Sequence, residues 1–404
     1  MIVLARFFPP EELGLYGLMV SAVAIATFLL GLEYHYFTMR AVIGRPPASQ
    51  VAVMRDQAVL YTVVASVALP LLALLMWTDR WAPVPKSALA WFLVLVVVEL
   101  AAQEAGIALI ALARPLAANL VLFVRSGAWV YPVIALAIFG VREIGYVFLA
   151  WLAGALASLA VAAWSLRGMG WRAALTEPIN WSAMRAGLRV AAPFVVTTGA
   201  SMGLLFLDRF IIAAYSGLGP VGVYTFFAGI TTALHTLVNT GISLVRMPML
   251  VEAAQDADEG RFRSELATMA RITIVSTLLL ALVIAAGIVP LLQVVGKAVY
   301  QENLVSFFLL LAAAMIRCVA DLPLYALYAK HRDLPLLAVN VTAFLVNVVL
   351  NVVLIPVFGL AGAAGSAVAG ATILFVFAAA VAVRGRGRIM RAAAEDAPPA
   401  RSVL

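Results

Sequence analysis

Long apolar runs, separated by short polar segments, follow one another from end to end of the 404-residue chain. A helix of about 20 apolar residues crosses the core of a bilayer. Spanning segments are expected to be helical because lipid offers no partners to open backbone groups. The pattern therefore predicts an all-α integral membrane protein with eleven complete spans, at residues 13–37, 53–77, 88–112, 115–139, 144–166, 188–214, 221–245, 266–292, 304–328, 334–357 and 361–383.

The basic residues between these runs predict the orientation. If the loop after the first run is cytoplasmic, that side holds 19 Lys and Arg and the opposite side holds 5, while Arg125, Arg209 and Arg317 inside the runs complete the 27. Basic loops remain in the cytoplasm, so we expect a cytoplasmic C-terminus. Eleven spans would then place the N-terminus outside. We therefore expect about twelve transmembrane helices, of which the first is truncated.

Two pairs of short motifs predict an internal repeat. Gly-Leu-Tyr at 14–16 matches Gly-Val-Tyr at 222–224, and Phe-Gly-Val at 139–141 matches Phe-Gly-Leu at 358–360. The alternative is that glycine–aromatic corners are simply common at helix ends. A true repeat gives two six-helix lobes of the same membrane orientation. The expected divisions are an N-lobe (1–166, first helix incomplete), a cytoplasmic linker (167–186), a C-lobe (187–383) and a basic cytoplasmic tail (384–404).

Composition supports this interpretation and excludes several functions. Hydrophobic residues make up 65% of the chain and charged residues 12%, whereas about a quarter of a soluble domain is charged. The single cysteine, Cys318, and three scattered histidines provide neither a disulfide nor metal-ligand spacing. No Walker phosphate loop occurs. We expect no cofactor and no enzyme activity, and we assign the net charge of +7 to membrane orientation rather than to nucleic-acid binding.

Three segments carry a resemblance to a known family. They are ARFFPPEELGLYGLMVSAVA at 5–24, DRFIIAAYSGLGPVGVYTFFAGI at 208–230 and LNVVLIPVFGLAGAAGSAVAG at 350–370. In this order they resemble Wzx-type polysaccharide flippases of the multidrug, oligosaccharidyl-lipid and polysaccharide exporter superfamily. The incomplete first helix departs from that family's pattern.

The resemblance implies a two-lobed carrier in the bacterial cytoplasmic (inner) membrane. Such a carrier moves an undecaprenyl-pyrophosphate-linked oligosaccharide to the outer leaflet by alternating access, for surface polysaccharide such as lipopolysaccharide O-antigen. The expected partners are this lipid-linked oligosaccharide, the lipid bilayer, a coupling H⁺ or Na⁺ ion and polysaccharide assembly proteins. Three alternatives stay open: a drug or small-solute antiporter of the same superfamily, a membrane polymerase or glycosyltransferase, and a scaffold that transports nothing.

Charged side chains within the spans are the candidate site residues, because each is costly in lipid unless it faces water or a partner. Arg125 has no carboxylate three or four positions away on its own helix. Arg209 follows Asp208 directly, and we expect the two side chains to point about 100° apart and to need separate partners. Arg317 can pair with Asp321 one turn away. We expect Arg125, Arg209 and Arg317 to bind the substrate diphosphate, since guanidinium offers paired donors to phosphate.

Carboxylates and a histidine in the spans are the candidates for ion coupling, because burial favours proton uptake by carboxylates. These candidates are Glu99, Glu104, Asp208, Asp321 and His235. For each, the competing interpretation is a structural hydrogen bond or ion pair. Glu33 and His35, near a cytoplasmic helix end, are expected to be solvated.

Overall fold

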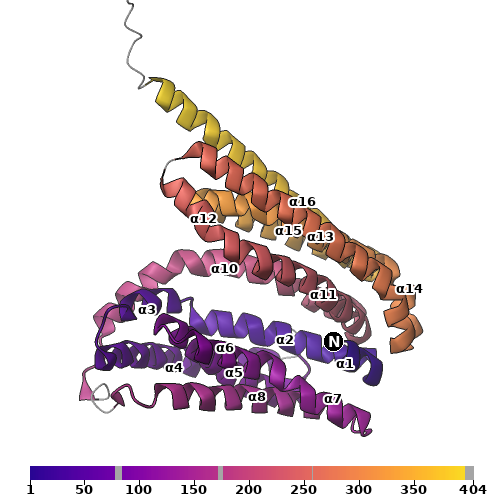
Figure 1. Cartoon of the computed structure of the whole chain (residues 1–404). Helices are drawn as coiled ribbons and strands as arrows, with labels where there is room; N and C mark the ends of the chain where they lie inside the picture. The colour runs from indigo at the N-terminus through magenta and orange to yellow at the C-terminus, as the bar shows by residue number, and fades with distance from the viewer. Residues whose placement is uncertain (78–83, 172–175, 257, 396–404) are drawn as a thin grey trace, which may run out of the picture. The chain divides into compact units, whose positions relative to one another are not determined.

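The computed structural model describes residues 1–77, 84–171, 176–256 and 258–395 (Figure 1). Every regular element in these ranges is a helix, which confirms the all-α prediction. Residues 172–175 of the predicted linker and 396–404 of the predicted tail lie outside the described ranges.

Ten spans in the described ranges are long and apolar enough to cross a membrane. They are α2 (Pro10–Gly31), α4 (Pro47–Trp77), α5 (Leu89–Ala111), α6 (Pro115–Phe123) continued by α7 (Val130–Ile138), α8 (Ile144–Leu166), α10 (Trp181–Ser216), α11 (Leu218–Val238), α13 (Glu259–Val295), α15 (Leu304–Ala329) and α16 (Asp333–Glu395). The remaining α-helices are α1 (Ile2–Phe7), α3 (His35–Val42), α12 (Leu244–Gln255) and α14 (Ala298–Glu302).

The last span is two helices joined by a sharp break. Gly359 within α16 has φ 55° and ψ −129°, which is not a helical conformation. The break separates the two predicted spans at 334–357 and 361–383. Gly140, its counterpart in the predicted repeat, also has a positive φ, 90°. Both positions favour glycine because a residue with a side chain rarely adopts a positive φ.

The first span ends earlier than predicted. Its helix stops at Gly31 instead of residue 37, and the next two residues, Leu32 and Glu33, have φ values of 48° and 54°. Residues with side chains rarely adopt this left-handed conformation. The chain turns at these residues and resumes as the separate helix α3, a change of direction that hydropathy cannot reveal.

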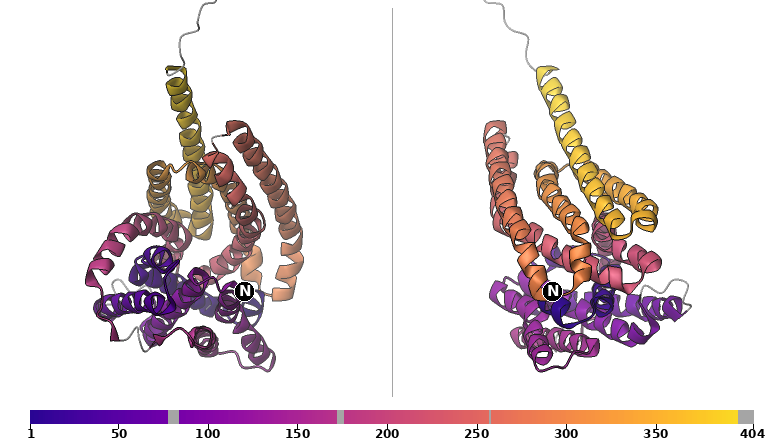
Figure 2. Two further views of the ribbon diagram at one scale, coloured as in Figure 1. Left: turned by 60° about the vertical axis from the view of Figure 1, so that its left-hand side comes forward. Right: turned by 90° about the vertical axis from the view of Figure 1, so that its right-hand side faces the viewer.

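The described chain separates into two compact units, with the division inside α11. We call residues 2–225 the N-unit and residues 226–395 the C-unit. In the N-unit, α5 packs against α2, α6 and α8, and α3 packs against α4, α5 and α10. In the C-unit, α13 packs against α15, and α15 against α16 (Figure 2). The lobe boundaries predicted around residues 167–186 stay a prediction.

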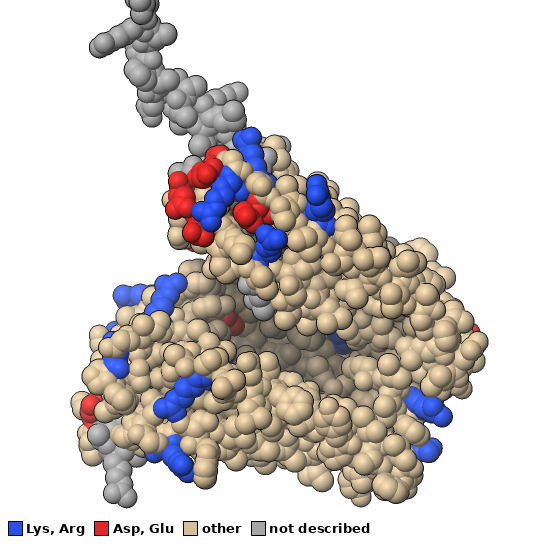
Figure 3. Space-filling view, viewed as in Figure 1, with Lys and Arg blue, Asp and Glu red and all other residues tan. Residues whose placement is uncertain are grey.

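Charged side chains lie mainly toward the helix ends, as a membrane-spanning protein requires. On the face shown in Figure 3, Lys and Arg side chains form a few small groups on a surface that consists mostly of uncharged residues. In the C-unit, one charged group joins the end of α12 to α13, where Arg261 pairs with Glu252 and Asp256 at 3.0 Å each. Lys330, which follows α15, pairs with Glu259.

The segment before α10 is fastened to α4 by polar contacts. Arg55 donates hydrogen bonds to the carbonyls of Glu177 at 2.6 Å and Pro178 at 3.2 Å. Its neighbour Asp56 accepts from the backbone N–H of Asn180 at 3.2 Å. Asn180 in turn caps α10 by accepting from the N–H of Ala183 at 2.9 Å. This part of the predicted linker therefore has a fixed place on the N-unit.

The glycines of the first repeated motif lie back to back, where α2 meets the start of α11. A Cβ added to Gly14 would lie 2.0 Å from the carbonyl oxygen of Leu218. A Cβ added to Gly222 would lie 1.8 Å from the carbonyl oxygen of Pro10. Each glycine thus meets the residue four positions before the other, so the contact is reciprocal. This local two-fold relation is what a duplicated motif predicts.

We expect Gly14→Ala and Gly222→Ala each to lower the unfolding temperature of the detergent-purified protein. Overpacking of this kind costs about 1–3 kcal/mol of unfolding free energy. Gly287→Ala in α13 is the matched control, because its Cβ would meet no heavy atom within 4 Å. Equal shifts in the Gly14 and Gly287 variants would show that the close helix contact does not contribute to stability.

Candidate functional site

Arg125 lies in the N-unit within a π-helical segment, Val124–Ala128, that joins α6 to α7. Its Nη1 donates to Glu99 Oε2 at 2.8 Å. The other oxygen of Glu99 accepts from the indole N–H of Trp151 at 2.5 Å. Arg125 therefore has a carboxylate partner from another helix, and Glu99, 6% exposed, has both oxygens occupied.

Aromatic rings surround this pair. Trp151 lies 6.4 Å from Trp129 and 6.2 Å from Tyr16, measured between ring centroids. Tyr16 belongs to the first repeated motif, so its position connects the glycine contact of α2 to the Glu99–Arg125 pair. The rings leave Glu99 with little access to water, and the arginine supplies the compensating charge that a buried carboxylate needs.

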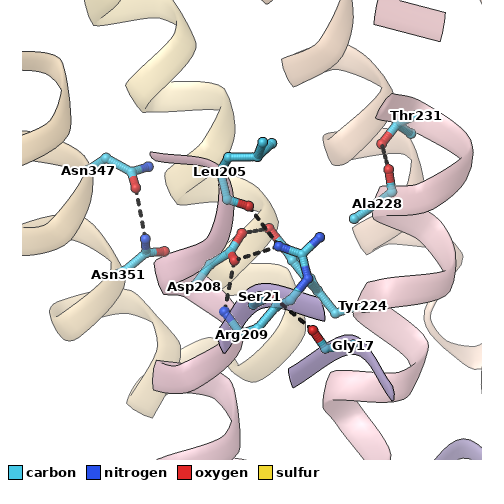
Figure 4. Close-up of polar contacts among 10 residues, drawn as sticks. All are labelled: Gly17, Ser21, Leu205, Asp208, Arg209, Tyr224, Ala228, Thr231, Asn347 and Asn351. Atoms are coloured by element: carbon cyan, nitrogen blue, oxygen red, sulfur yellow. Dashed lines mark hydrogen bonds and ion pairs between the residues drawn. The ribbon is translucent and has the colours of Figure 1, made fainter. Parts of the chain in front are cut away.

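Asp208 and Arg209 form a second pair in the N-unit (Figure 4). Asp208 accepts from the hydroxyl of Tyr224, the tyrosine of the second repeated motif. Arg209 Nη1 donates to the Leu205 carbonyl at 2.7 Å and lies 3.3 Å from Asp208 Oδ1. The guanidinium also lies over the rings of Phe206 and Tyr224, at 5.6 and 5.7 Å.

The expectation that Asp208 and Arg209 would not pair with each other was wrong. Adjacent Cα–Cβ directions on a helix do diverge by about 100°, but the arginine side chain is long enough to curl back along the helix to the preceding carboxylate. The expected separate partner for Asp208 is present as Tyr224.

The third group lies in the C-unit and joins α11 to α15. Asp321 Oδ1 is 3.3 Å from Arg317 Nε, and Asp321 Oδ2 is 2.7 Å from His235 Nε2. The predicted Arg317–Asp321 ion pair is therefore confirmed. One turn further along both helices, Asn239 donates to the hydroxyl of Tyr325 at 2.7 Å. A single carboxylate here serves two basic groups.

The three groups differ in how exposed the arginine side chain is and in whether its guanidinium has a carboxylate of its own. The side chains of Arg125 and Arg209 are 21% and 11% exposed, and each has its own carboxylate. Arg317 is 32% exposed, and within the described part of the chain Asp321 is its only hydrogen-bonding or ionic partner. Its Nη groups can therefore donate to an added anion. This group is the best suited of the three to bind phosphate oxygens.

Glu104 lies in a different environment, at the end of α5 in the N-unit. It accepts from Gln57 at 2.7 Å and from the hydroxyl of Tyr61. These groups line a largely apolar pocket of about 350 Å³. His35 Nδ1 lies 3.8 Å from Glu104, and His35 Nε2 lies 3.9 Å from Glu33. The expectation that Glu33 and His35 would be solvated was wrong, because their side chains are only 11% and 15% exposed.

Sequence patterns did not predict the two π-helical segments beside the candidate residues. One is Val124–Ala128 around Arg125, and the other, Asn239–Ser243, follows α11. π-Helical turns are rare and occur frequently at functional sites. The available signal was a small polar cluster with one glycine inside an apolar run, RSGA in the first case and NTGIS in the second.

Comparisons with known proteins place these groups in a known fold. A family model described as polysaccharide biosynthesis protein matches residues 1–254. A search of curated protein sequences found no match. An inward-facing multidrug resistance MATE family transporter of the MOP superfamily aligns with a TM-score of 0.75 at 16% identity, covering 98% of this chain and 94% of that one.

Two further solved structures are similar. A MATE protein in a bent conformation gives a TM-score of 0.58 at 14% identity, covering 96% of this chain and 95% of that one. A MOP superfamily transporter from Pyrococcus furiosus, described as having a binding pocket of reverse polarity, gives 0.55 at 15% identity, covering 96% and 88%. At such identities the likeness concerns the fold, and it confirms the predicted all-α membrane architecture.

We expect Glu99→Ala to lower the free energy of unfolding by about 3–5 kcal/mol, since it leaves the Arg125 guanidinium without its carboxylate. Arg125→Ala should also destabilise the protein, because it leaves the buried Glu99 without its charged partner. The double variant should lose less unfolding free energy than the sum of the losses in the two single variants. Thermal unfolding in detergent measures the coupling, with the exposed Glu302→Ala as control. Additive losses would contradict the ion pair.

Proposed function

Since the chain belongs to the polysaccharide biosynthesis protein family, we propose that it flips a lipid-linked oligosaccharide across the bacterial cytoplasmic membrane. The MOP superfamily fold and the ten long apolar spans of the described residues support a multi-pass membrane transporter. The cargo that we propose is an undecaprenyl-pyrophosphate-linked oligosaccharide destined for surface polysaccharide. The fold, which is similar to that of solved MATE and MOP superfamily transporters, does not favour the polymerase or glycosyltransferase alternative.

The observation that carries the proposal is the Arg317–Asp321–His235 group. A lipid diphosphate brings negative charge into an apolar region, so it needs basic groups that an internal carboxylate does not fully neutralise. Asp321 is shared between Arg317 at 3.3 Å and His235 at 2.7 Å. Diphosphate oxygens can accept from the Arg317 Nη groups while Asp321 stays with His235.

The remaining candidates take supporting roles in this proposal. Arg125 and Arg209 are further diphosphate contacts, each reached by exchanging its carboxylate partner for phosphate. Glu99 and Asp208 then become free to take up a proton, which makes them ion-coupling candidates together with Asp321 and His235. Alternating access moves the diphosphate to the outer leaflet while the polyprenyl tail stays in lipid. The 19-to-5 distribution of basic residues supports a cytoplasmic C-terminus.

We expect Arg317→Ala to reduce export of surface polysaccharide at least about tenfold, which corresponds to about 1.4 kcal/mol of lost binding to the transported anion. Arg317→Lys should restore export only in part, because lysine cannot offer the planar pair of donors. The measurement is surface polysaccharide in cells whose only copy is the variant, together with lipid-linked oligosaccharide on the cytoplasmic leaflet and protein abundance.

Arg263→Ala is the matched control, since Arg263 is 57% exposed and, among the residues that the structure describes, pairs only with Glu259, at 3.8 Å. We expect Arg125→Ala and Arg209→Ala also to abolish export at near-normal abundance. Normal export in all three span-arginine variants would contradict the diphosphate assignment. Loss of function without accumulation of the lipid-linked oligosaccharide would instead favour the drug or small-solute antiporter.

A further inference from the structure

We propose that Glu33, His35 and Glu104 form a proton-binding site in the N-unit, separate from the arginine groups. The residues come from two parts of the chain. Glu33 and His35 lie at the turn between α2 and α3, and Glu104 lies near the end of α5. The side chains are 11%, 15% and 12% exposed, so all three are shielded from bulk water.

The imidazole lies between the two carboxylates and presents a different nitrogen to each. Nε2 is 3.9 Å from Glu33 Oε2, and Nδ1 is 3.8 Å from Glu104 Oε1. A shift of about 1 Å would bring either nitrogen to hydrogen-bonding distance. Because a neutral imidazole donates through one nitrogen and accepts through the other, His35 can pass a proton from one carboxyl to the other.

Neutral donors hold the carboxylates in place. Gln57 donates to Glu104 Oε2 at 2.7 Å and also to the hydroxyl of Tyr61 at 2.7 Å. Glu33 has a hydrogen bond with Thr198 of α10. These contacts fix the positions of the two carboxylates without cancelling their charge.

No strong base stands nearby to neutralise the two carboxylates. Among the described residues, His35 is the only basic group within 4 Å of either one. Tyr36 lies against the His35 ring, and Tyr61 interacts with Glu104. Arg55 is taken by Asp56 at 2.6 Å, which also acts on Tyr34. Arg40 of α3 and Arg185 and Arg189 of α10 have exposed side chains. Proton uptake is therefore the route by which this site loses charge.

The backbone turns sharply at Glu33, and the glutamate is buried there. Leu32 and Glu33 both have left-handed φ values, 48° and 54°. Non-glycine residues held in this conformation carry strain that the surrounding structure must offset, and such residues cluster at functional sites. Gly31 lies just before them, and a Cβ there would stand 3.6 Å from Glu104 Oε1. The end of α2 thus packs directly on the second carboxylate.

The directions of the pKa shifts of Glu33 and His35 agree with a proton that the site shares. Burial raises the pKa of Glu33, and the hydrogen bond from Thr198 only partly opposes this. Burial lowers the pKa of His35. A raised carboxyl pKa and a lowered imidazole pKa both favour a neutral ring beside a protonated carboxyl. With both carboxylates ionised and the ring neutral the trio carries two negative charges, and one proton from water reduces this to one.

A proton fits the site better than a metal ion. No group of three His, Cys, Asp or Glu in the described ranges is arranged to hold a metal. Gln57 also directs an N–H at Glu104 Oε2, and a donor at that oxygen would repel a cation. The site is distinct from Arg317, so proton occupancy and diphosphate binding can alternate. This use for coupling rests on the proposed function, but proton binding itself does not.

The test is a pH titration of the purified full-length protein by infrared difference spectroscopy, without substrate. We expect a protonated carboxyl C=O band that disappears between about pH 5 and pH 8. Glu33→Gln and Glu104→Gln should each weaken this band and move its transition to lower pH, because the remaining carboxyl stays buried but no longer has a negative neighbour. Glu302→Gln, an exposed site, should leave it unchanged. A band absent from the parent, or unchanged in both variants, would overturn the proposal.

Two further measurements keep the test valid if a variant folds poorly. The parent has three histidines, so ¹⁵N-labelled imidazole signals can be assigned with His35→Gln, and His35 should stay neutral to lower pH than an exposed histidine. In proteoliposomes, Glu104→Gln should lose the acceleration of transport by a pH gradient but keep exchange without one. Arg317→Ala should lose both. Loss in Arg317→Ala alone would retain the proposed function and reject the proton site.

Discussion

The close contact of Gly14 with Gly222 is the constraint on which the central part of the structure depends. Within a membrane, helices gain little from hydrophobic burial against each other, so close van der Waals packing between small residues becomes the main attraction. The two glycines let α2 and α11 meet backbone to backbone, with Gly17 packed against Thr225 three residues along each helix. A side chain at either glycine would hold the two helices apart.

The tyrosine two residues after each of these glycines extends the same contact to charged groups. Tyr16 packs against Trp151, which donates to Glu99, the partner of Arg125. Tyr224 donates directly to Asp208, the partner of Arg209. Each copy of the Gly-x-Tyr motif therefore packs two helices through its glycine and positions an acid–base pair through its tyrosine. This shared arrangement explains why the chain carries the motif twice.

The sequence was sufficient for the features that depend on local composition. Hydropathy located the spans, and the matched glycines marked both the break at Gly359 and the contact at Gly222. The sequence was insufficient for features that depend on which helices are neighbours. Glu99 and Arg125 are 26 positions apart, and their pairing requires knowing that α5 and the α6–α7 segment pack together. Glu33 and His35 were misjudged because a position near a span end suggests water, whereas the turn at Leu32 directs them inward.

The π-helical segment at Val124–Ala128 has a consequence for any analysis of this span by helical periodicity. Widening one turn adds a residue to it, so all later side chains are rotated by about 100° relative to an uninterrupted α-helix. A helical wheel drawn from Pro115 to Ile138 would thus assign the α7 residues to the wrong sides. The lipid-facing and protein-facing positions of α6 and α7 have to be read on separate wheels, one for each side of Arg125.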